Sequence, residues 1–223
     1  MPESKSKLFN DQGELVVPKA VVGRLSLYLR EAQHLIRDGK ETTNSTELGK
    51  LLGVTDAQVR KDLAYFGQFG HPGVGYRCQA LVAAIKSIMG TNTIWNVALV
   101  GIGNLGRALL RYKGFHEQGF QIVAAFDVDD NVIGTKVEGV DVYHIRDLAS
   151  MVTAQSIRLV AISVPSHAAQ AVVDQVVEVG IEGILNFAPV TISVPSKVRV
   201  IGVDLAMELE QLAFTVVNRD SKS

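Results

Sequence analysis

The chain has 223 residues, one cysteine and a formal net charge of −1 at pH 7. The single Cys78 excludes an internal disulfide framework, no uncharged apolar run approaches the roughly 18 residues of a membrane-spanning helix, and the near-neutral charge of the whole chain argues against a nucleic-acid-binding protein. The polar start lacks the apolar core of a signal peptide, so we expect a cytoplasmic protein in which Cys78 is inert or, as the less favoured alternative, a redox-active thiol.

The charge is not spread evenly along the chain. Residues 1–90 hold 12 Lys and Arg against 9 Asp and Glu, a net charge of +3, whereas residues 91–223 hold 10 against 14, a net charge of −4. This asymmetry agrees with a DNA-facing first half, although a chance distribution of surface charge is an alternative.

The first part of the chain has the pattern of a small helical domain. Residues 1–17 are predicted to be a flexible arm, and residues 18–90 a winged helix-turn-helix domain. Pro18 suits the first position of a helix that extends to residue 37. Capping-box patterns at residues 44–47 and 55–58 predict two short helices, over residues 45–52 and 56–66, with a glycine turn between them. A further helix is predicted over residues 81–89.

Two short capped helices joined by a tight turn are typical of the helix-turn-helix motif. In the second helix, Val59, Leu63 and Phe66 are predicted to face the core. Arg60 and Lys61 then lie elsewhere on the helix, where they can reach guanine edges or phosphates in a major groove. The alternative is a helical hairpin with a solvated basic pair.

Four glycines and a proline surround aromatic residues in residues 67–77, which predicts a hairpin with an exposed tip, the wing of a winged helix. Its tip is predicted to enter a minor groove. A metal site at His71 is disfavoured because no cysteine or carboxylate clusters nearby, and no metal is expected. The predicted DNA-binding residues of this domain are Thr55, Gln58, Arg60, Lys61, Tyr65, His71, Gly73, Tyr76 and Arg77.

The second domain, residues 91–203, begins with the pattern of a dinucleotide-binding fold. A strand over residues 96–100 meets three glycines in the order Gly101, Gly103 and Gly106, and a helical pattern opens at Arg107. The first glycine permits a tight turn, the second a close approach of backbone to a pyrophosphate, and the third close packing of helix on strand. A second strand, over residues 121–126, ends at Asp127, whose carboxylate can bind the ribose hydroxyls and repel a 2′-phosphate. NAD(H) is therefore favoured over NADP(H).

The rest of this domain alternates between strands and helices, as a parallel sheet requires. A loop-rich stretch to residue 143 precedes a helix over residues 147–153, a strand over 158–164, a helix over 165–179 and strands over 183–187 and 198–203. Ligands of such sheets bind beyond the carboxyl ends of the strands. The predicted nucleotide-binding residues are Gly101, Ile102, Gly103, Asn104, Leu105, Gly106, Asp127, Val128, Ser163, Val164, Pro165, Asn186, Ala188 and Pro189.

The chain closes with an apolar helix, residues 204–219, that covers either its own sheet or a partner subunit. We favour a partner, because the two-fold symmetry of DNA operators requires a dimer. The apolar side chains on one face of this helix are Leu205, Leu209, Leu212, Ala213, Val216 and Val217.

Hydride-transferring enzymes need a substrate pocket and a proton-transferring group. His116, His144 and His167 are the candidates, but none lies in a recognisable catalytic setting, and no substrate domain is appended. We therefore predict no catalytic residues. A small NAD-dependent oxidoreductase is the alternative, and a nucleotide-binding interaction module without DNA affinity is a third possibility.

The combined motifs resemble those of the bacterial redox-sensing transcriptional repressor Rex family. The matching stretches are residues 59–67 (VRKDLAYFG), 73–76 (GVGY), 101–106 (GIGNLG), 183–189 (GILNFAP) and 203–206 (VDLA), and the likeness covers about residues 17–217. The resemblance implies a homodimer that binds palindromic operators while NADH is scarce and releases DNA when NADH binds. It also implies that the C-terminal helix is exchanged between subunits and lies between the two kinds of domain.

NADH and NAD⁺ differ by one charge at the nicotinamide, so a sensor of their ratio needs a group that responds to that charge. We hypothesise that Asp204 pairs with Arg30 in the DNA-binding state and with Tyr112 in the released state. Each of the three is otherwise an ordinary surface residue.

Overall fold

The computed structural model describes residues 17–70 and 74–219. The chain divides into two compact units, residues 1–93 and 94–223, each described by itself below. This division falls three residues after the expected end of the first domain at Gly90. No helix in the described ranges is long and apolar enough to cross a membrane. Of the predicted arm, residues 1–16 lie outside the described residues, and Val17 is buried.

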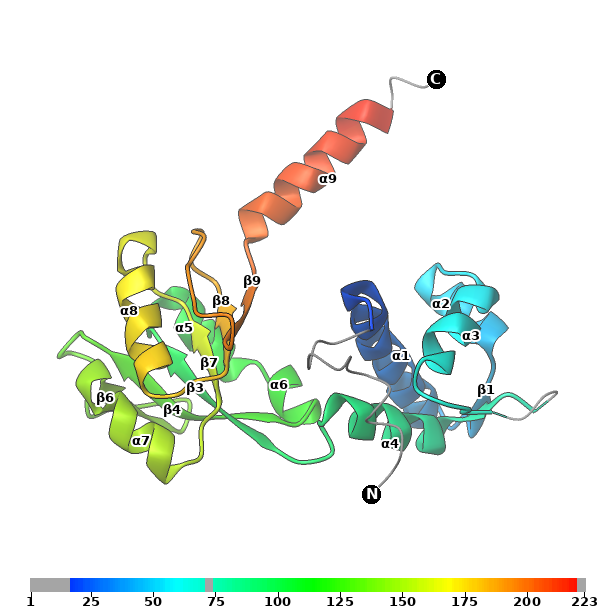
Figure 1. Ribbon diagram of the computed structural model, residues 1–223, viewed down its shortest axis with the longest axis horizontal. Coiled ribbons are helices and arrows are strands. Elements are labelled where there is room, and N and C mark those ends of the chain that lie inside the picture. The colour runs from blue at the N-terminus through cyan, green and yellow to red at the C-terminus, as the bar shows by residue number, and fades with distance from the viewer. Residues whose placement is uncertain (1–16, 71–73, 220–223) are drawn as a thin grey trace. The chain divides into compact units, whose positions relative to one another are not determined.

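The described part of the N-terminal unit is a bundle of four helices with a two-stranded sheet at its side (Figure 1). The helices are α1 (Lys19–Arg37), α2 (Ser45–Leu52), α3 (Asp56–Ala64) and α4 (Cys78–Met89), and the strands are β1 (Thr42–Thr43) and β2 (Tyr76–Arg77). α4 begins three residues before the predicted start, and α3 ends two residues before the predicted end. The core of the unit is formed by buried side chains from all four helices, among them Leu25, Tyr28, Leu48, Val59, Leu63, Leu81 and Ile85.

The helix-turn-helix motif is confirmed, and its caps explain where the helices begin. Asn44 Oδ1 accepts a hydrogen bond from Glu47 N at 2.9 Å, and Thr55 Oγ1 accepts one from Gln58 N at 3.1 Å. Gly53 ends α2 in the left-handed conformation (φ 67°), which suits glycine. The reciprocal half of each capping box is not formed, because the Glu47 and Gln58 side chains bind other partners.

In the described residues the local strand pair expected within residues 67–77 is not formed, and residues 71–73, at its expected tip, lie outside them. β2 instead pairs antiparallel with β1, with Thr42 opposite Arg77 and Thr43 opposite Tyr76. The loop nevertheless closes on itself, since a Cβ on Gly70 would lie 2.5 Å from the Gly75 carbonyl oxygen. Glycines weaken a strand, which agrees with β2 pairing with the distant β1 and not with residues 67–70.

The C-terminal unit is built on a seven-stranded sheet in the order β5-β6-β4-β3-β7-β8-β9. All neighbouring strands are parallel except β5 and β6, which confirms the Rossmann-type parallel sheet. The chain runs outward from β3 in both directions, so the strand order reverses between β3 and β7. The strands are β3 (Trp95–Val100), β4 (Phe120–Asp127), β5 (Lys136–Val137), β6 (Val140–His144), β7 (Leu159–Ile162), β8 (Gly183–Asn186) and β9 (Arg199–Gly202).

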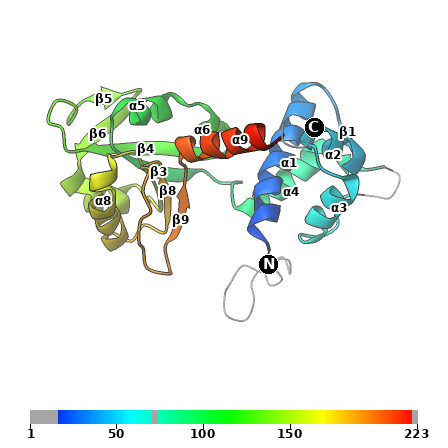
Figure 2. The same ribbon diagram turned by 90° about the horizontal axis from the view of Figure 1, so that it is seen from above.

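Helices cover the two faces of this sheet unequally, and α5 and α8 lie on opposite faces (Figure 2). α7 and α8 pack on one face with side chains such as Val100 and Phe126, whereas α5 packs on the other face with Leu99 and Ala125. The helices are α5 (Asn104–Arg111), α6 (Gly114–Glu117), α7 (Leu148–Ala154), α8 (Ser166–Glu178) and α9 (Leu205–Arg219), with a 3₁₀ turn at Ile145–Asp147.

Two expectations for this unit are corrected. The stretch before residue 143, expected to be loop-rich, contains the β5–β6 hairpin, whose turn residues Glu138 and Gly139 both have positive φ (52° and 84°). A glutamate is unusual in such a turn, which normally takes Asn-Gly or Asp-Gly, so the sequence gives a weak signal. α5 also begins at Asn104, three residues before the predicted start at Arg107.

Gly103, just before α5, and Gly106, in its first turn, differ in how much space surrounds them, and this difference leads to a prediction about stability. A Cβ on Gly106 would lie 2.0 Å from the Gly101 carbonyl oxygen, whereas a Cβ on Gly103 would meet nothing within 4 Å. Gly106→Ala should therefore lower the free energy of unfolding by about 2 kcal/mol or more. Gly103→Ala, the matched control, should cost less than about 1 kcal/mol. Urea unfolding followed by the fluorescence of the single Trp95 measures both, and equal losses would contradict the packing argument.

Candidate functional site

The glycine-rich loop lies at the carboxyl end of β3, where the strand order reverses. Gly101 has φ +94°, and a Cβ there would lie 2.6 Å from the Ser163 carbonyl oxygen. The contact between Gly106 and Gly101 brings the first turn of α5 against the end of β3. Gly103 is exposed, with open space around it. The loop therefore leaves backbone N–H groups at the start of a helix accessible, as an anion-binding loop requires.

Asp127 is directed at this loop. Its Oδ2 accepts a hydrogen bond from Ile102 N at 2.6 Å, and its Oδ1 accepts from Val128 N at 2.7 Å and Asp129 N at 3.1 Å. The carboxylate thus links the end of β4 to the glycine-rich loop. The contact between Asp127 and a ribose stays a prediction. Both carboxylate oxygens already accept backbone hydrogen bonds, so a ribose hydroxyl would have to share one of them.

Two further predicted nucleotide-binding side chains are occupied within the protein. Ser163 Oγ donates to the Gly101 carbonyl oxygen at 2.8 Å and so steadies the loop. Asn186 is 2% exposed. Its Nδ2 donates to the carbonyl oxygens of Ala188 and Val190 at 3.1 Å each, and its Oδ1 accepts from Ala188 N at 3.0 Å. These hydrogen bonds make Ser163 and Asn186 supports of the crevice wall.

The other predicted nucleotide-binding residues follow the carboxyl ends of four adjacent strands, β4, β3, β7 and β8. Ile102 and Ala188 are buried and Val164 is half-buried, so they contribute backbone or packing. The exposed members of the set are Gly103, Asn104, Leu105, Val128, Pro165 and Pro189.

Sequence reasoning missed a hollow that joins this edge of the sheet to the last helix. Its volume is about 420 Å³, and it extends from Asn186 and Pro189 to Asp204 and Met207. Val190 and Thr191 in its wall had no sequence signal, because the loop after β8 has no motif beyond its proline. Asp204 therefore lies at the same hollow as residues predicted to bind the nucleotide.

α9 buries none of its residues. Asp204 caps it, since Oδ1 accepts hydrogen bonds from Ala206 N at 2.9 Å and Met207 N at 3.2 Å. Leu209 is 67% exposed and Phe214 70% exposed. Met207 and Phe214, seven residues apart, add a second apolar stripe to the predicted one. A helix that is apolar on two sides is typically covered on both.

A second apolar surface lies on the sheet face that carries α5. Over β7, β8 and β9 this face has a groove of about 380 Å³, lined by residues that include Ile122, Leu159, Ala161, Leu185 and Ile201. Ile201 is strongly exposed there.

In the N-terminal unit, the face of α3 opposite the core carries Ala57, Lys61 and Ala64, all exposed, while Val59 and Leu63 are buried. The two alanines leave Lys61 standing out from the helix. Among the described residues, no hydrogen bond or ion pair holds its ammonium group. Both cations of α3, Arg60 and Lys61, are exposed, and Lys61 is the one that the contacts among the described residues leave free to reach a ligand.

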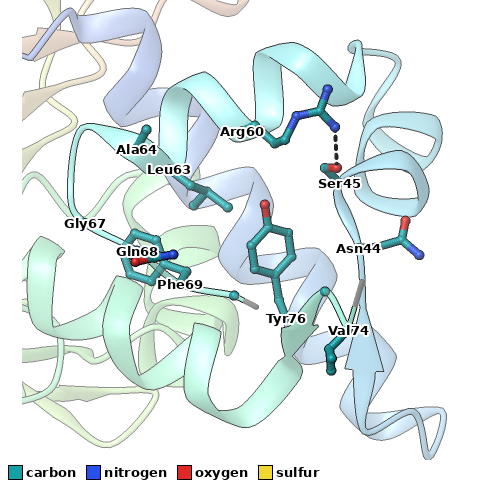
Figure 3. A pocket seen from close by; sticks show the side chains of 12 residues that line it. Asn44, Ser45, Arg60, Leu63, Ala64, Gly67, Gln68, Phe69, Val74 and Tyr76 are labelled. Carbon is teal, nitrogen blue, oxygen red and sulfur yellow. Dashed lines mark hydrogen bonds between the residues drawn. The ribbon is translucent and has the colours of Figure 1, made fainter. Parts of the chain in front are cut away.

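Arg60 lies beside the exposed face of α3 that carries Lys61, and its guanidinium group is held by hydrogen bonds. Its Nη1 donates to Ser45 Oγ at 3.0 Å (Figure 3) and to Asp56 Oδ2 at 2.7 Å. It borders a hollow of about 580 Å³ between α3, the start of α2 and the loop before β2. Figure 3 shows Tyr76 directed from β2 toward the part of α3 that carries Arg60 and Leu63. Burial raises the pKa of Tyr76, so its hydroxyl is a neutral donor at physiological pH.

The remaining predicted DNA-binding residues have different positions. Thr55 is the cap of α3, Gln58 hydrogen-bonds Asp62, and Tyr65 and Arg77 are exposed. His71 and Gly73 lie outside the described residues. Whether any of these residues touches DNA stays a prediction.

The three hypothesised switch residues are at the surface or half-buried. Arg30 is exposed on α1 of the N-terminal unit. In the C-terminal unit, Tyr112 is 58% exposed, and its ring stands edge-on to Phe115 at 5.1 Å. That ring also occupies the space where a Cβ on Gly114 would lie.

Little in the described part of the chain points to metal or thiol chemistry. No group of three or more His, Cys, Asp or Glu side chains there could hold a metal ion. His144 Nδ1 accepts from Arg146 N at 3.1 Å, while His116 and His167 are exposed. Cys78 is buried, and burial raises the pKa of its thiol, which disfavours the reactive thiolate.

Comparison with known proteins agrees with the two units. Residues 16–64 match the family model described as "Putative DNA-binding protein N-terminus", and residues 92–190 match that described as "CoA binding domain". The chain is similar to the solved structure of RSP in complex with beta-NAD+ and operator DNA, with a TM-score of 0.87 and 30% identity over 93% of this chain and 95% of that one. It is also similar to RSP in complex with beta-NADH, with a TM-score of 0.83, 28% identity and coverage of 93% and 97%.

Two curated relatives carry the same name. The chain is 44% identical to the redox-sensing transcriptional repressor Rex of Pelotomaculum thermopropionicum over 94% of this chain and 98% of that one. It is 46% identical to the Rex protein of Carboxydothermus hydrogenoformans over 90% and 96%. These relatives are named as transcriptional repressors and not as enzymes. The chain belongs to the family of redox-sensing transcriptional repressors named Rex.

Proposed function

We propose that this protein is a transcriptional repressor that binds a palindromic operator while NADH is scarce and leaves it when NADH binds. The observation that carries the proposal is that one chain, closely similar to Rex repressors over nearly its whole length, holds both a helix-turn-helix motif and a glycine-rich loop at the switch point of a parallel sheet. In this proposal the protein acts on DNA in the cytoplasm.

The glycine-rich loop fits a dinucleotide as effector ligand. Gly103 has the open space that a pyrophosphate needs for close approach, and the first turn of α5 presents its N–H groups there. Asp127 lies at the end of the neighbouring strand, where its charge disfavours a 2′-phosphate and so favours NAD(H) over NADP(H). When bound, NADH brings a neutral nicotinamide where NAD⁺ brings a cationic one.

The functional unit of this proposal is a homodimer. Two surfaces support it: the apolar α9, which the chain leaves exposed, and the apolar groove over β7, β8 and β9. We propose that α9 is exchanged between subunits, which covers its apolar stripes. Two-fold symmetry then matches the protein to a palindromic operator.

Asp204 is the proposed centre of the switch, because it lies at the hollow beside the predicted nucleotide crevice and at the start of α9. In this proposal it pairs with Arg30 when the protein binds DNA and with Tyr112 when it is released. A swing from 1:99 to 99:1 requires about 5.5 kcal/mol of differential affinity. One charge-assisted contact contributes roughly 1.5–3 kcal/mol, so two symmetric sites are needed.

The direct test is a gel shift on a duplex that the protein itself selects from a random pool, titrated with NADH and NAD⁺ separately. Micromolar NADH should release the duplex, whereas NAD⁺ should not. Selection of no duplex would overturn the repressor function. Turnover of NADH with a substrate would support the oxidoreductase instead.

The recognition helix gives a second prediction. Lys61 lies opposite the core of the unit, so we expect it to contact base edges, and Arg60, held beside the start of α2, to contact phosphate. Lys61→Ala should cost about 1–3 kcal/mol and relax preference at one base position. Arg60→Ala should weaken binding to all duplexes and lower the salt slope by about 1. Arg37→Ala, which removes a charge outside α3, is the control, and exchanged phenotypes would reverse the assignment.

The cap formed by Asp204 sharpens the test of the switch. Asp204→Asn removes the charge and keeps an oxygen that can accept from the N–H groups of Ala206 and Met207, so α9 stays capped. The charge is then lost from both pairings, so the ratio of the DNA affinity without NADH to that with saturating NADH should fall at least about tenfold, while NADH binding to the free protein changes little. Glu208→Gln, which removes a charge one turn further on, is the control. An unaltered response of Asp204→Asn would reject Asp204 as the sensor.

A further inference from the structure

Asp62, on the helix proposed to enter the major groove, is a buried carboxylate that the proposed function does not use. Its side chain is fully buried, and it accepts hydrogen bonds from three residues. Arg24 donates through Nε at 2.5 Å and Nη2 at 2.8 Å, Tyr28 through its hydroxyl at 2.7 Å, and Gln58 through Nε2 at 2.6 Å. Four donors therefore converge on one carboxylate.

The directions of the pKa shifts indicate that Asp62 is ionised and that Tyr28 is neutral in this cluster. Burial alone would raise the pKa of Asp62, but the hydrogen bonds from Arg24, Tyr28 and Gln58 outweigh it and hold the pKa below its usual range. Burial and the adjacent Asp62 raise the pKa of Tyr28, so its hydroxyl stays a donor. An ion pair on a buried carboxylate is not in itself a gain in stability over an apolar core, so we look for its use in fixing a geometry.

The geometry in question is the placement of α3 on α1. Arg24 and Tyr28 are one turn apart on α1, and Gln58 and Asp62 are one turn apart on α3. The bidentate guanidinium fixes the direction of the carboxylate, and the phenol fixes its position along α1. Apolar contacts between two helices tolerate a small rotation of one helix about its own axis, which we call a roll. The directional hydrogen bonds to Asp62 do not tolerate it.

Lys61 is the neighbour of Asp62 in the chain, is exposed, and lies about 100° around α3 from it. A roll of α3 that leaves the core almost unchanged moves the end of this long side chain most. The orientation of Asp62 and the aim of Lys61 are therefore coupled through the helix between them.

We propose that Asp62 is a positioning residue for DNA recognition: with Arg24 and Tyr28 it locks the roll of α3 on α1 and so aims Lys61 and Arg60, while Gln58, on α3 itself, holds the carboxylate in its direction. Gln58, which the sequence predicted to contact DNA, belongs to this lock. The inference rests on the proposed DNA-binding function.

The test compares specific with non-specific affinity in the full-length protein. Tyr28→Phe and Gln58→Met each remove one donor and keep the size of the side chain. For each variant, affinity is measured for the duplex selected by the unaltered protein and for an unrelated duplex of equal length. We expect the ratio of the two affinities to fall roughly tenfold, about 1.4 kcal/mol, in each variant. Binding of the unrelated duplex, which depends on charge, should stay unchanged.

The matched control is Ile85→Val, a change in the same core that removes no member of the lock. Variants are compared at equal active concentration, so lost stability alone does not alter the ratio. An unchanged ratio in Tyr28→Phe and Gln58→Met, or an equal fall in Ile85→Val, would overturn the inference while leaving the repressor function intact. A Gln58→Met change of preference at one base pair only would make Gln58 a base-contacting residue and remove it from the lock. If the unaltered protein selects no duplex, both proposals fail.

Discussion

The C-terminal unit depends on a backbone contact that only glycine permits. Gly106, in the first turn of α5, lies so close to the Gly101 carbonyl oxygen that any side chain would overlap it. This contact places the helix start directly at the end of β3, and Asp127 and Ser163 hold the loop from the strands on either side. The crevice is therefore shaped before any ligand enters it, and its polar groups are aimed by the fold rather than by the ligand.

The N-terminal unit uses directional hydrogen bonds for a comparable purpose. Its helices pack through an apolar core, but the position of α3 is specified by the carboxylate of Asp62 and its donors on α1. Arg30 lies two residues beyond Tyr28 on that same helix. In the proposed function, α1 and α3 thus move as one body, so a force applied at Arg30 reaches the DNA-contacting helix without a separate relay.

Much of this could be predicted from the sequence, because the signals were local. The glycine spacing, the caps at Asn44 and Thr55 and the alternation of strands and helices are all set by residues within a few positions of one another. The β1–β2 pairing joins segments more than thirty residues apart, and the Glu138-Gly139 turn departs from common turn chemistry. The hydrogen-bond partners of individual polar side chains could likewise not be predicted from the sequence. Nothing near Gln58, Ser163 or Asn186 in the chain reveals that their polar groups are satisfied inside the protein.

The exposure of α9 also bears on the life of the protein in the cell. In the proposed homodimer, a chain without its partner exposes a long apolar helix to water, and chaperones and proteases bind such surfaces. The fraction of newly made chains that escapes degradation would therefore depend on how quickly they dimerise. When the gene is weakly expressed, the amount of folded dimer would then fall more steeply than the rate of synthesis. The regulator would therefore need a minimum rate of synthesis to be present at all.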